Sequence, residues 1–228
     1  MPIFQLTDAP VFPHSSLAED NGLLAVGGDL SLQRLLAAYS NGIFPWYSEG
    51  DPPLWWFTSP RLVIFPAEFK VPKRLARALR NTNFQISFDQ DFARIISSCA
   101  DVRKENGEGT WISTDMQKAY GELHQAGFAH SVECWLDGEL AGGLYGVQLG
   151  NVFFGESMFT KISNGSKAAL VALVTNLQQQ GVTLIDCQMT TNHLMTFGAR
   201  EITGSEFRRH LKIHINPSDC TTKSNDTD

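Results

Sequence analysis

An acid and an amide follow a short apolar run late in the chain, and they are well placed to do chemistry. The run 182–185 predicts a buried strand, and Asp186 and Gln188 come directly after it. Positions two apart on a strand face the same side, so we expect both side chains to project into one space. A buried carboxylate is costly unless it is paired, hydrogen-bonded or given a task. Asp186 could also cap the helix that follows, and this stretch alone favours that plainer interpretation.

A second acid, Glu156, lies among apolar residues in the segment Phe153–Phe159, where it must meet a positive or donor group. The chain lacks the residue motifs that other familiar catalytic mechanisms require. The chain has no Gly-x-Ser-x-Gly nucleophile motif, and the Ser-Lys pair at 166–167 lacks the upstream glycine of a phosphate-binding loop. The six histidines are dispersed, and His193 by itself is more typical of a core or capping residue. We therefore expect no metal site.

A basic segment without acids covers residues 70–80. A helix that begins near Pro72 turns Leu75 and Leu79 inward and places four cations outward: Lys73, Arg74, Arg77 and Arg80. Such a charge run is usually a solvated helix face, but the absence of acids favours contact with a phosphate backbone. The net charge of -6 argues against a protein that coats nucleic acid indiscriminately.

Large aromatic residues are dense between residues 43 and 57, and Trp111 stands where a polar loop, 101–109, meets the start of a helix. Such residues form either a small packed core or a platform on which flat groups stack. We expect both, with one tryptophan exposed.

The elements that position these residues indicate an α+β fold. Residues 1–61 predict a small N-terminal α/β domain, with a helix between Ser31 and Gly42. Residues 62–215 predict a catalytic domain with a helix at 91–98, a mostly antiparallel strand meander from 130 to 156, a long helix after 164 and an edge strand at 200–202. The glycine-dense run 141–146 indicates a bulge or a close approach of the backbone to a ligand. The polar tail, 216–228, predicts disorder.

Composition is that of an ordinary globular chain, with 43% hydrophobic and 18% charged residues among 228. No apolar run approaches the roughly 20 residues of a membrane helix, and the N-terminus lacks a signal-peptide pattern. The four cysteines are scattered, so neither a zinc site nor a disulfide framework is indicated. We expect a cytoplasmic protein with reduced thiols and no membrane partner.

Many motifs together resemble the bacterial leucyl/phenylalanyl-tRNA–protein transferase family, in register along nearly the whole chain. They are Asn21–Leu30, Gly42–Trp46, Leu54–Trp56, Glu108–Ile112, Gly142–Gly146, Phe154–Phe159, Ser166–Lys167 and Leu184–Gln188. The tail after His214 matches least.

The resemblance implies an aminoacyl transfer. The enzyme takes leucine, phenylalanine or methionine from aminoacyl-tRNA and joins it to the α-amine of a protein that begins with Arg or Lys. The product enters the N-end rule degradation pathway through the Clp protease system. The implied catalytic fold is a GNAT-like acyltransferase domain. Because the pyrophosphate loop of ordinary GNAT enzymes is missing before the long helix, we expect no coenzyme A and no other cofactor.

The resemblance also assigns roles to residues. In the mechanism that it implies, Asp186 polarises Gln188, which draws a proton from the incoming amine. Because a neutral amide is a poor base, we favour Gln188 as the group that orients the amine and Asp186 as an attraction for its cationic form, and whether Asp186 moves a proton stays open. Glu156 binds the α-amino group of the tRNA-borne amino acid, and Trp46 and Trp111 stack on the terminal adenine. The four outward cations of 73–80 hold acceptor-stem phosphates. The side-chain pocket comprises Leu144, Phe153, Met158, Leu170, Leu173, Leu177 and Ile185.

Two alternatives remain open at this point. One is a GNAT-like enzyme that uses a small acyl donor, which a coenzyme A binding assay would reveal. The other is a non-catalytic RNA-binding module, for which the acids Asp186 and Glu156 would be needlessly costly.

Overall fold

A computed structural model of the chain describes residues 3–105 and 110–221. Its N-terminal part forms a four-stranded sheet in the order β1-β2-β4-β3. The strands are β1 (Phe4–Leu6), β2 (Leu23–Gly27), β3 (Phe44–Pro45) and β4 (Leu54–Trp56). A short 3-10 helix (Ser15–Leu17) and helix α1 (Leu32–Ser40) accompany this sheet. The Ser31 hydroxyl caps α1 by accepting from the Arg34 amide, as the sequence predicts.

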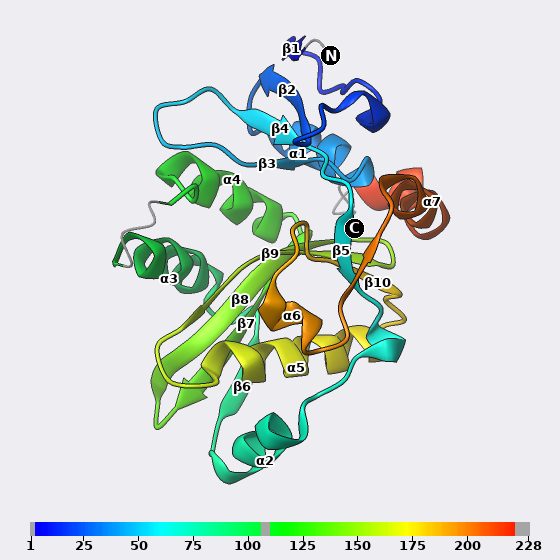
Figure 1. Cartoon of the computed structure of the whole chain (residues 1–228). Coiled ribbons are helices and arrows are strands. Elements are labelled where there is room, and N and C mark those ends of the chain that lie inside the picture. Colours follow the sequence, from blue (N-terminus) through cyan, green and yellow to red (C-terminus); the bar gives the residue numbers. More distant parts are fainter. Residues whose placement is uncertain (1–2, 106–109, 222–228) are drawn as a thin grey trace, which may run out of the picture.

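The rest of the chain builds a seven-stranded sheet in the order β11-β5-β10-β9-β8-β7-β6 (Figure 1). Strands β9 and β10 pair in parallel, and the other neighbours pair antiparallel. The predicted α+β class with a mostly antiparallel sheet is therefore confirmed. The strands are β5 (Arg61–Ile64), β6 (Gln85–Phe88), β7 (Ala129–Leu136), β8 (Glu139–Leu149), β9 (Val152–Thr160), β10 (Leu184–Asp186) and β11 (Arg200–Ile202).

Helices cover both faces of the large sheet. Helices α3 (Phe92–Glu105) and α4 (Thr114–Gln125) lie on one face, and α5 (Gly165–Gln179) lies on the other (Figure 1). Each face has its own apolar cluster, and the cluster under α3 and α4 continues into the four-stranded sheet. The two sheets therefore share one core. The remaining helices are α2 (Lys73–Asn81), α6 (Asn192–Met195), α7 (Gly204–His214) and the 3-10 turns Pro66–Glu68 and Pro217–Cys220.

The predicted bulge in the run 141–146 is present in β8, because Gly142 lies opposite Cys134 and Leu140 lies opposite Trp135, which leaves Ala141 as an extra residue. Between β8 and β9 the register shifts, with Tyr145 opposite Ser157 and Gly146 opposite Gly155, so Glu156 is the extra residue of a bulge. A Cβ on Gly146 would lie 2.5 Å from the Phe153 ring. A Cβ on Gly142 would lie 2.6 Å from the Ser166 amide, so at this glycine the close neighbour is α5. A close approach to a ligand stays a prediction.

Two local predictions were wrong, and one strand was not predicted. Helix α3 continues to Glu105, so residues 101–105 are helical instead of belonging to the expected loop, because Ala100 and its buried neighbours keep the apolar face in register. Strand β5 was not anticipated, and it opens with an arginine. Residues 217–220 form a 3-10 turn, because Asn216 and Asp219 make a reciprocal capping box. The remainder of the predicted tail, 222–228, lies outside the described residues.

No helix in the described ranges combines the length and apolar character that crossing a bilayer requires.

Candidate active site

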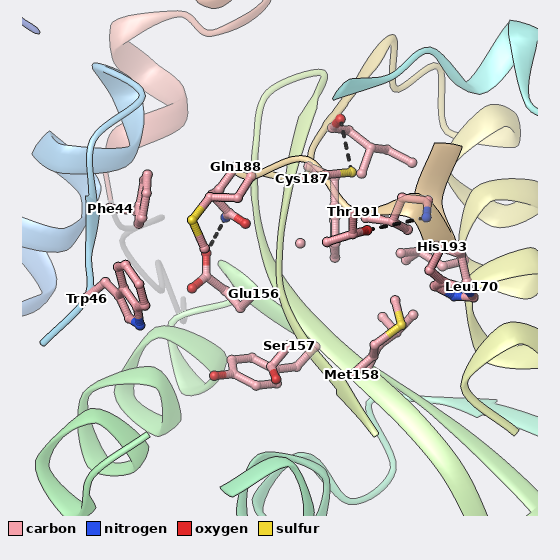
Figure 2. A pocket seen from close by; sticks show the side chains of 18 of the residues that line it. Phe44, Trp46, Glu156, Ser157, Met158, Leu170, Cys187, Gln188, Thr191 and His193 are labelled. Carbon is pink, nitrogen blue, oxygen red and sulfur yellow. Dashed lines mark hydrogen bonds between the residues drawn. The ribbon is translucent and has the colours of Figure 1, made fainter. Parts of the chain in front are cut away.

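A cavity of about 360 Å³ opens where strands β8, β9 and β10 face the β3 segment of the smaller sheet. Figure 2 shows Phe44 and Trp46 on one side of Glu156 and Gln188, with Met158 and Leu170 on the other. The walls come from both sheets and from α5 and α6. The cavity thus lies at the junction of the two parts of the fold.

Glu156 enters this cavity because of the bulge in β9. The bulge lets the neighbouring residues Glu156 and Ser157 both line the cavity instead of facing opposite sides of the sheet. One Glu156 carboxylate oxygen, Oε2, accepts from the Tyr120 hydroxyl at 3.1 Å, and the other, Oε1, accepts from the Gln188 amide nitrogen at 3.2 Å.

Burial raises the pKa of the Glu156 carboxyl to about 7, and the charge of Asp186 acts in the same direction. Hydrogen bonds from Tyr39 and Tyr120 and the charge of Arg61 oppose this rise. The two tyrosine hydroxyls also bond each other. Burial and the charge of Glu156 hold the pKa of both tyrosines well above the usual value, so they remain donors. The carboxylate is thus poised to gain from a cation placed beside it.

Asp186 lies at the end of β10, as predicted, but it does not face the cavity. Its carboxylate is fully buried and forms a two-point ion pair with Arg61, which donates from Nε to Oδ1 and from Nη2 to Oδ2, both at 2.7 Å. Oδ1 also accepts from the Gln188 backbone amide at 3.0 Å. The expectation that Asp186 and Gln188 project into one space was wrong, because the strand ends at Asp186 and the chain then turns.

Gln188 makes that turn with a φ of +52°, in the left-handed region that residues with a Cβ rarely adopt. Its side chain lines the cavity, and its Nε2 donates to Glu156. An ionised carboxylate can only accept, so this contact assigns the amide nitrogen to Glu156. The amide oxygen then has no donor among the described residues.

The apolar wall contains six of the seven residues predicted for a side-chain pocket. They are Leu144, Phe153, Met158, Leu170, Leu173 and Ile185. Leu177 is not among the lining residues; it is 2% exposed and packs in the core one turn further along α5 than Leu173. A periodic helix pattern does not distinguish the residues that border a cavity from those that pack beyond it.

Trp46 and Trp111 both line the cavity, although they come from distant parts of the chain. Trp46 is 38% exposed, in line with the expectation of one exposed tryptophan, and its ring lies 5.7 Å from that of Trp56. The backbone carbonyl of Trp46 accepts from the Trp56 indole at 2.7 Å. This contact fixes the segment that carries the exposed ring.

Several lining residues were not predicted as functional. Burial raises the pKa of the Cys187 thiol well above its usual value, so it is a poor nucleophile. His193 lines the cavity, and burial together with the charge of Lys167 lowers its pKa, which favours a neutral ring. The buried Ser157 hydroxyl has no partner among the described residues and can bond to a ligand.

Arg61, Tyr39 and Tyr120 are further contributors that the sequence did not single out. An arginine directly before the apolar run 62–64 was the available signal for Arg61.

The predicted basic helix is α2, and its cations Lys73, Arg74, Arg77 and Arg80 lie on its outer side, while Leu75 is buried. None of the four lines the cavity. Figure 1 shows α2 at the end of the molecule away from the four-stranded sheet. Any contact of these residues with a ligand in the cavity therefore requires a ligand that extends well beyond it.

This arrangement suits a reaction between two bound groups. An apolar pocket, an anionic group and a neutral acceptor amide lie side by side, and the tyrosines supply donors. Within residues 3–105 and 110–221, no three His, Cys, Asp or Glu side chains gather as metal ligands do.

Comparison with known proteins identifies relatives over almost the whole chain. The family model "Leucyl/phenylalanyl-tRNA protein transferase" matches residues 63–212, and the model of that family's N-terminal domain matches residues 28–59. The transferase of that name from Desulfotalea psychrophila is 55% identical over 94% of this chain and 95% of its own length. The one from Syntrophobacter fumaroxidans is 57% identical over 94% and 92%.

Solved structures show weaker likeness. A ribosomal-protein-alanine N-acetyltransferase from Brucella melitensis is 17% identical, with a TM-score of 0.32 over 42% of this chain and 72% of that one. The chain belongs to the leucyl/phenylalanyl-tRNA–protein transferase family of aminoacyltransferases.

Proposed function

We propose that this protein moves leucine, phenylalanine or methionine from aminoacyl-tRNA to the α-amine of proteins that begin with Arg or Lys. The observation that carries the proposal is the cavity itself, in which an apolar pocket adjoins one carboxylate, Glu156. A leucyl, phenylalanyl or methionyl group combines an unbranched or γ-branched apolar side chain with a cationic α-amine.

The donor side of the reaction uses the pocket and Glu156. The residues Leu144, Phe153, Met158, Leu170, Leu173 and Ile185 receive the side chain, and Glu156 pairs with the α-ammonium group. A low-dielectric site strengthens such a pair. An apolar pocket discriminates weakly per methylene, so rejection of Ile and Val depends on a clash of their β-branch at the pocket entrance.

The acceptor side uses Gln188. Its amide nitrogen donates to Glu156. Its amide oxygen, which has no donor among the described residues, accepts from an N–H of the incoming amine. Asp186 has no access to that amine, since its carboxylate is buried against Arg61. Asp186 therefore does not attract the cationic amine directly. It acts indirectly, through Gln188.

The bond changes need no covalent enzyme intermediate. The neutral amine attacks the ester carbonyl, a C–N bond forms, and the C–O bond to the terminal ribose breaks. The amine loses a proton and the ribose oxygen gains one, directly or through the neighbouring hydroxyl. Because the ester is already activated, correct placement of the two groups supplies most of the catalysis.

The tRNA itself is held by surfaces outside the pocket. Trp46 and Trp111 offer rings for the terminal adenine, and the outward cations of α2 contact acceptor-stem phosphates without reading sequence. The preference for Arg or Lys, the N-end rule pathway and a cytoplasmic location rest on the family resemblance. We propose no role for coenzyme A.

The test is peptide extension. Purified protein is mixed with phenylalanyl-tRNA and a peptide that begins with Arg, and the product is followed by mass spectrometry. We expect a peptide one phenylalanine longer. A matched peptide that begins with Asp serves as the control, and acetyl-coenzyme A replaces the tRNA in a parallel reaction. Acetylation of the peptide, with no extension by tRNA, would overturn the proposal in favour of a small-acyl transferase.

A further inference from the structure

Arg61 is a fully buried cation that contacts both parts of the fold, yet it does not line the cavity. Its guanidinium lies 4.9 Å from the ring centre of Phe44 and 4.6 Å from that of Phe207. Nη2 also donates to the Gly42 carbonyl at 2.9 Å, and Nη1 donates to the Thr58 hydroxyl at 3.4 Å. With Nε and Nη2 engaged by Asp186, all three nitrogens of this arginine are bonded within the protein.

The partner of Arg61 has its oxygens committed as well. Asp186 Oδ1 accepts from both Arg61 Nε and the Gln188 backbone amide, and Oδ2 accepts from Arg61 Nη2. A carboxylate held in this way, with no exposed surface, cannot reach an amine in the cavity. Its remaining contribution to the reaction is to fix Gln188.

Gln188 needs such fixing. Its φ of +52° is unfavourable for a residue with a Cβ, and such a conformation persists only where the surroundings impose it. Here Asp186 binds its N–H, while the Thr58 hydroxyl at 3.3 Å and the Leu62 amide at 3.4 Å bind its carbonyl. Arg61 touches both Asp186 and Thr58, so one guanidinium supports both ends of this residue.

We propose that Arg61 is a positioning residue of the transfer reaction: it fixes Asp186 and Thr58, which hold Gln188 in the conformation that presents its amide to Glu156 and the acceptor amine. The inference rests on the proposed aminoacyl transfer. It predicts that the charge of Asp186 matters only as the partner of Arg61. A double variant in which both side chains are neutral and similar in shape should then transfer faster than either single variant, in which one charge is buried without its partner.

The experiment compares Arg61→Met, Asp186→Asn and the double variant with wild type. The single-turnover rate of peptide extension is measured at saturating phenylalanyl-tRNA, with the KM for tRNA and the melting temperature. We expect Arg61→Met to lower the rate by about tenfold or more, with KM changed by less than about threefold. In the double variant the new side-chain amide at position 186 can still accept from the Gln188 N–H. We expect the rate there to recover by at least about threefold over Arg61→Met.

Arg34→Met is the matched control. Arg34 is equally buried, pairs with Asp29 at 3.3 Å and donates to the Thr7 carbonyl at 2.7 Å, away from the cavity. We expect a lower melting temperature and a rate within about twofold of wild type. If Arg61→Met does not fold, Arg61→Lys takes its place: it keeps the charge but loses the two-point contact, and a rate loss of about threefold or more is expected.

A wild-type rate in Arg61→Met, or in Arg61→Lys where that variant is used, would overturn the inference. So would folded Asp186→Asn and double variants that are both inactive, since the carboxylate would then take part in the reaction itself. Failure of the wild-type protein to extend any peptide is a different result, which would overturn the proposed function.

Discussion

Glu156 combines a raised pKa with a position in the cavity, and this gives it a measurable effect on stability. Its pKa of about 7, against an ordinary 4.5, means that the folded protein holds this proton more tightly than the unfolded chain. Folding stability therefore falls as pH rises from about 4.5 to about 7, by up to roughly 3 kcal/mol for this group.

The variant Glu156→Gln tests this at the residue scale. The amide has no charge to bury, so above pH 7 we expect the variant to melt a few degrees higher than wild type. This gain in melting temperature should shrink as the pH is lowered and vanish near pH 4.5. Melting curves between pH 4.5 and 8.5 measure it, and a gain that does not depend on pH would contradict the account of Glu156.

At the scale of elements, α5 separates cavity residues from core residues within one turn. Leu173 lines the cavity and Leu177 does not, although both are buried. Truncating either leucine to alanine should cost about 2–4 kcal/mol of stability. Only Leu173→Ala enlarges the pocket, so only this variant should raise the rate with phenylalanyl-tRNA relative to leucyl-tRNA. Competition between the two charged tRNAs measures the ratio, and an equal change in Leu177→Ala would show that the pocket is misplaced.

We predict that the outward cations of α2 contribute to tRNA binding and that their contribution weakens as salt is added. Each phosphate contact that is lost lowers the slope of log affinity against log salt by about 0.7 to 0.9. Changing Lys73 and Arg77 to glutamine should therefore reduce the slope by about 1.5. The matched control changes Arg209 and Lys212 on α7, which are also exposed. If the control reduces the slope as much as the α2 variant does, the binding is not localised on α2.

The sequence predicted the elements better than their contacts. The strand before Asp186, the basic helix and the exposed tryptophan all follow from local patterns. The partner of Asp186 does not, because Arg61 is 125 residues away and meets it only when β5 pairs with β10. The position of Glu156 depends on a bulge, whose glycine signal was visible but whose register was not. Similarly, Tyr39 and Tyr120 occupy ordinary apolar positions on two helices, and only packing brings their hydroxyls to Glu156.

At the scale of the whole molecule, the site is a product of the junction between the two sheets. The smaller sheet contributes Phe44 and Trp46, and the larger contributes Glu156 and the turn at Gln188. The buried Arg61 connects these walls through Phe44 and Asp186. The N-terminal part thus supplies one wall of the cavity, through Phe44, Pro45 and Trp46.

The central claim is that Glu156 binds the amino group of the transferred residue. The decisive measurement compares phenylalanyl-tRNA with tRNA that carries 3-phenylpropionate, which lacks that amine, in wild type and in Glu156→Gln. Within one protein, the ratio of kcat/KM for the two donors also reflects the different intrinsic reactivity of their esters. That difference is the same for both proteins, so it cancels when the ratio in wild type is divided by the ratio in the variant. We predict that wild type favours the amino donor by about 10- to 100-fold more than the variant does. An identical ratio in both proteins would contradict the account.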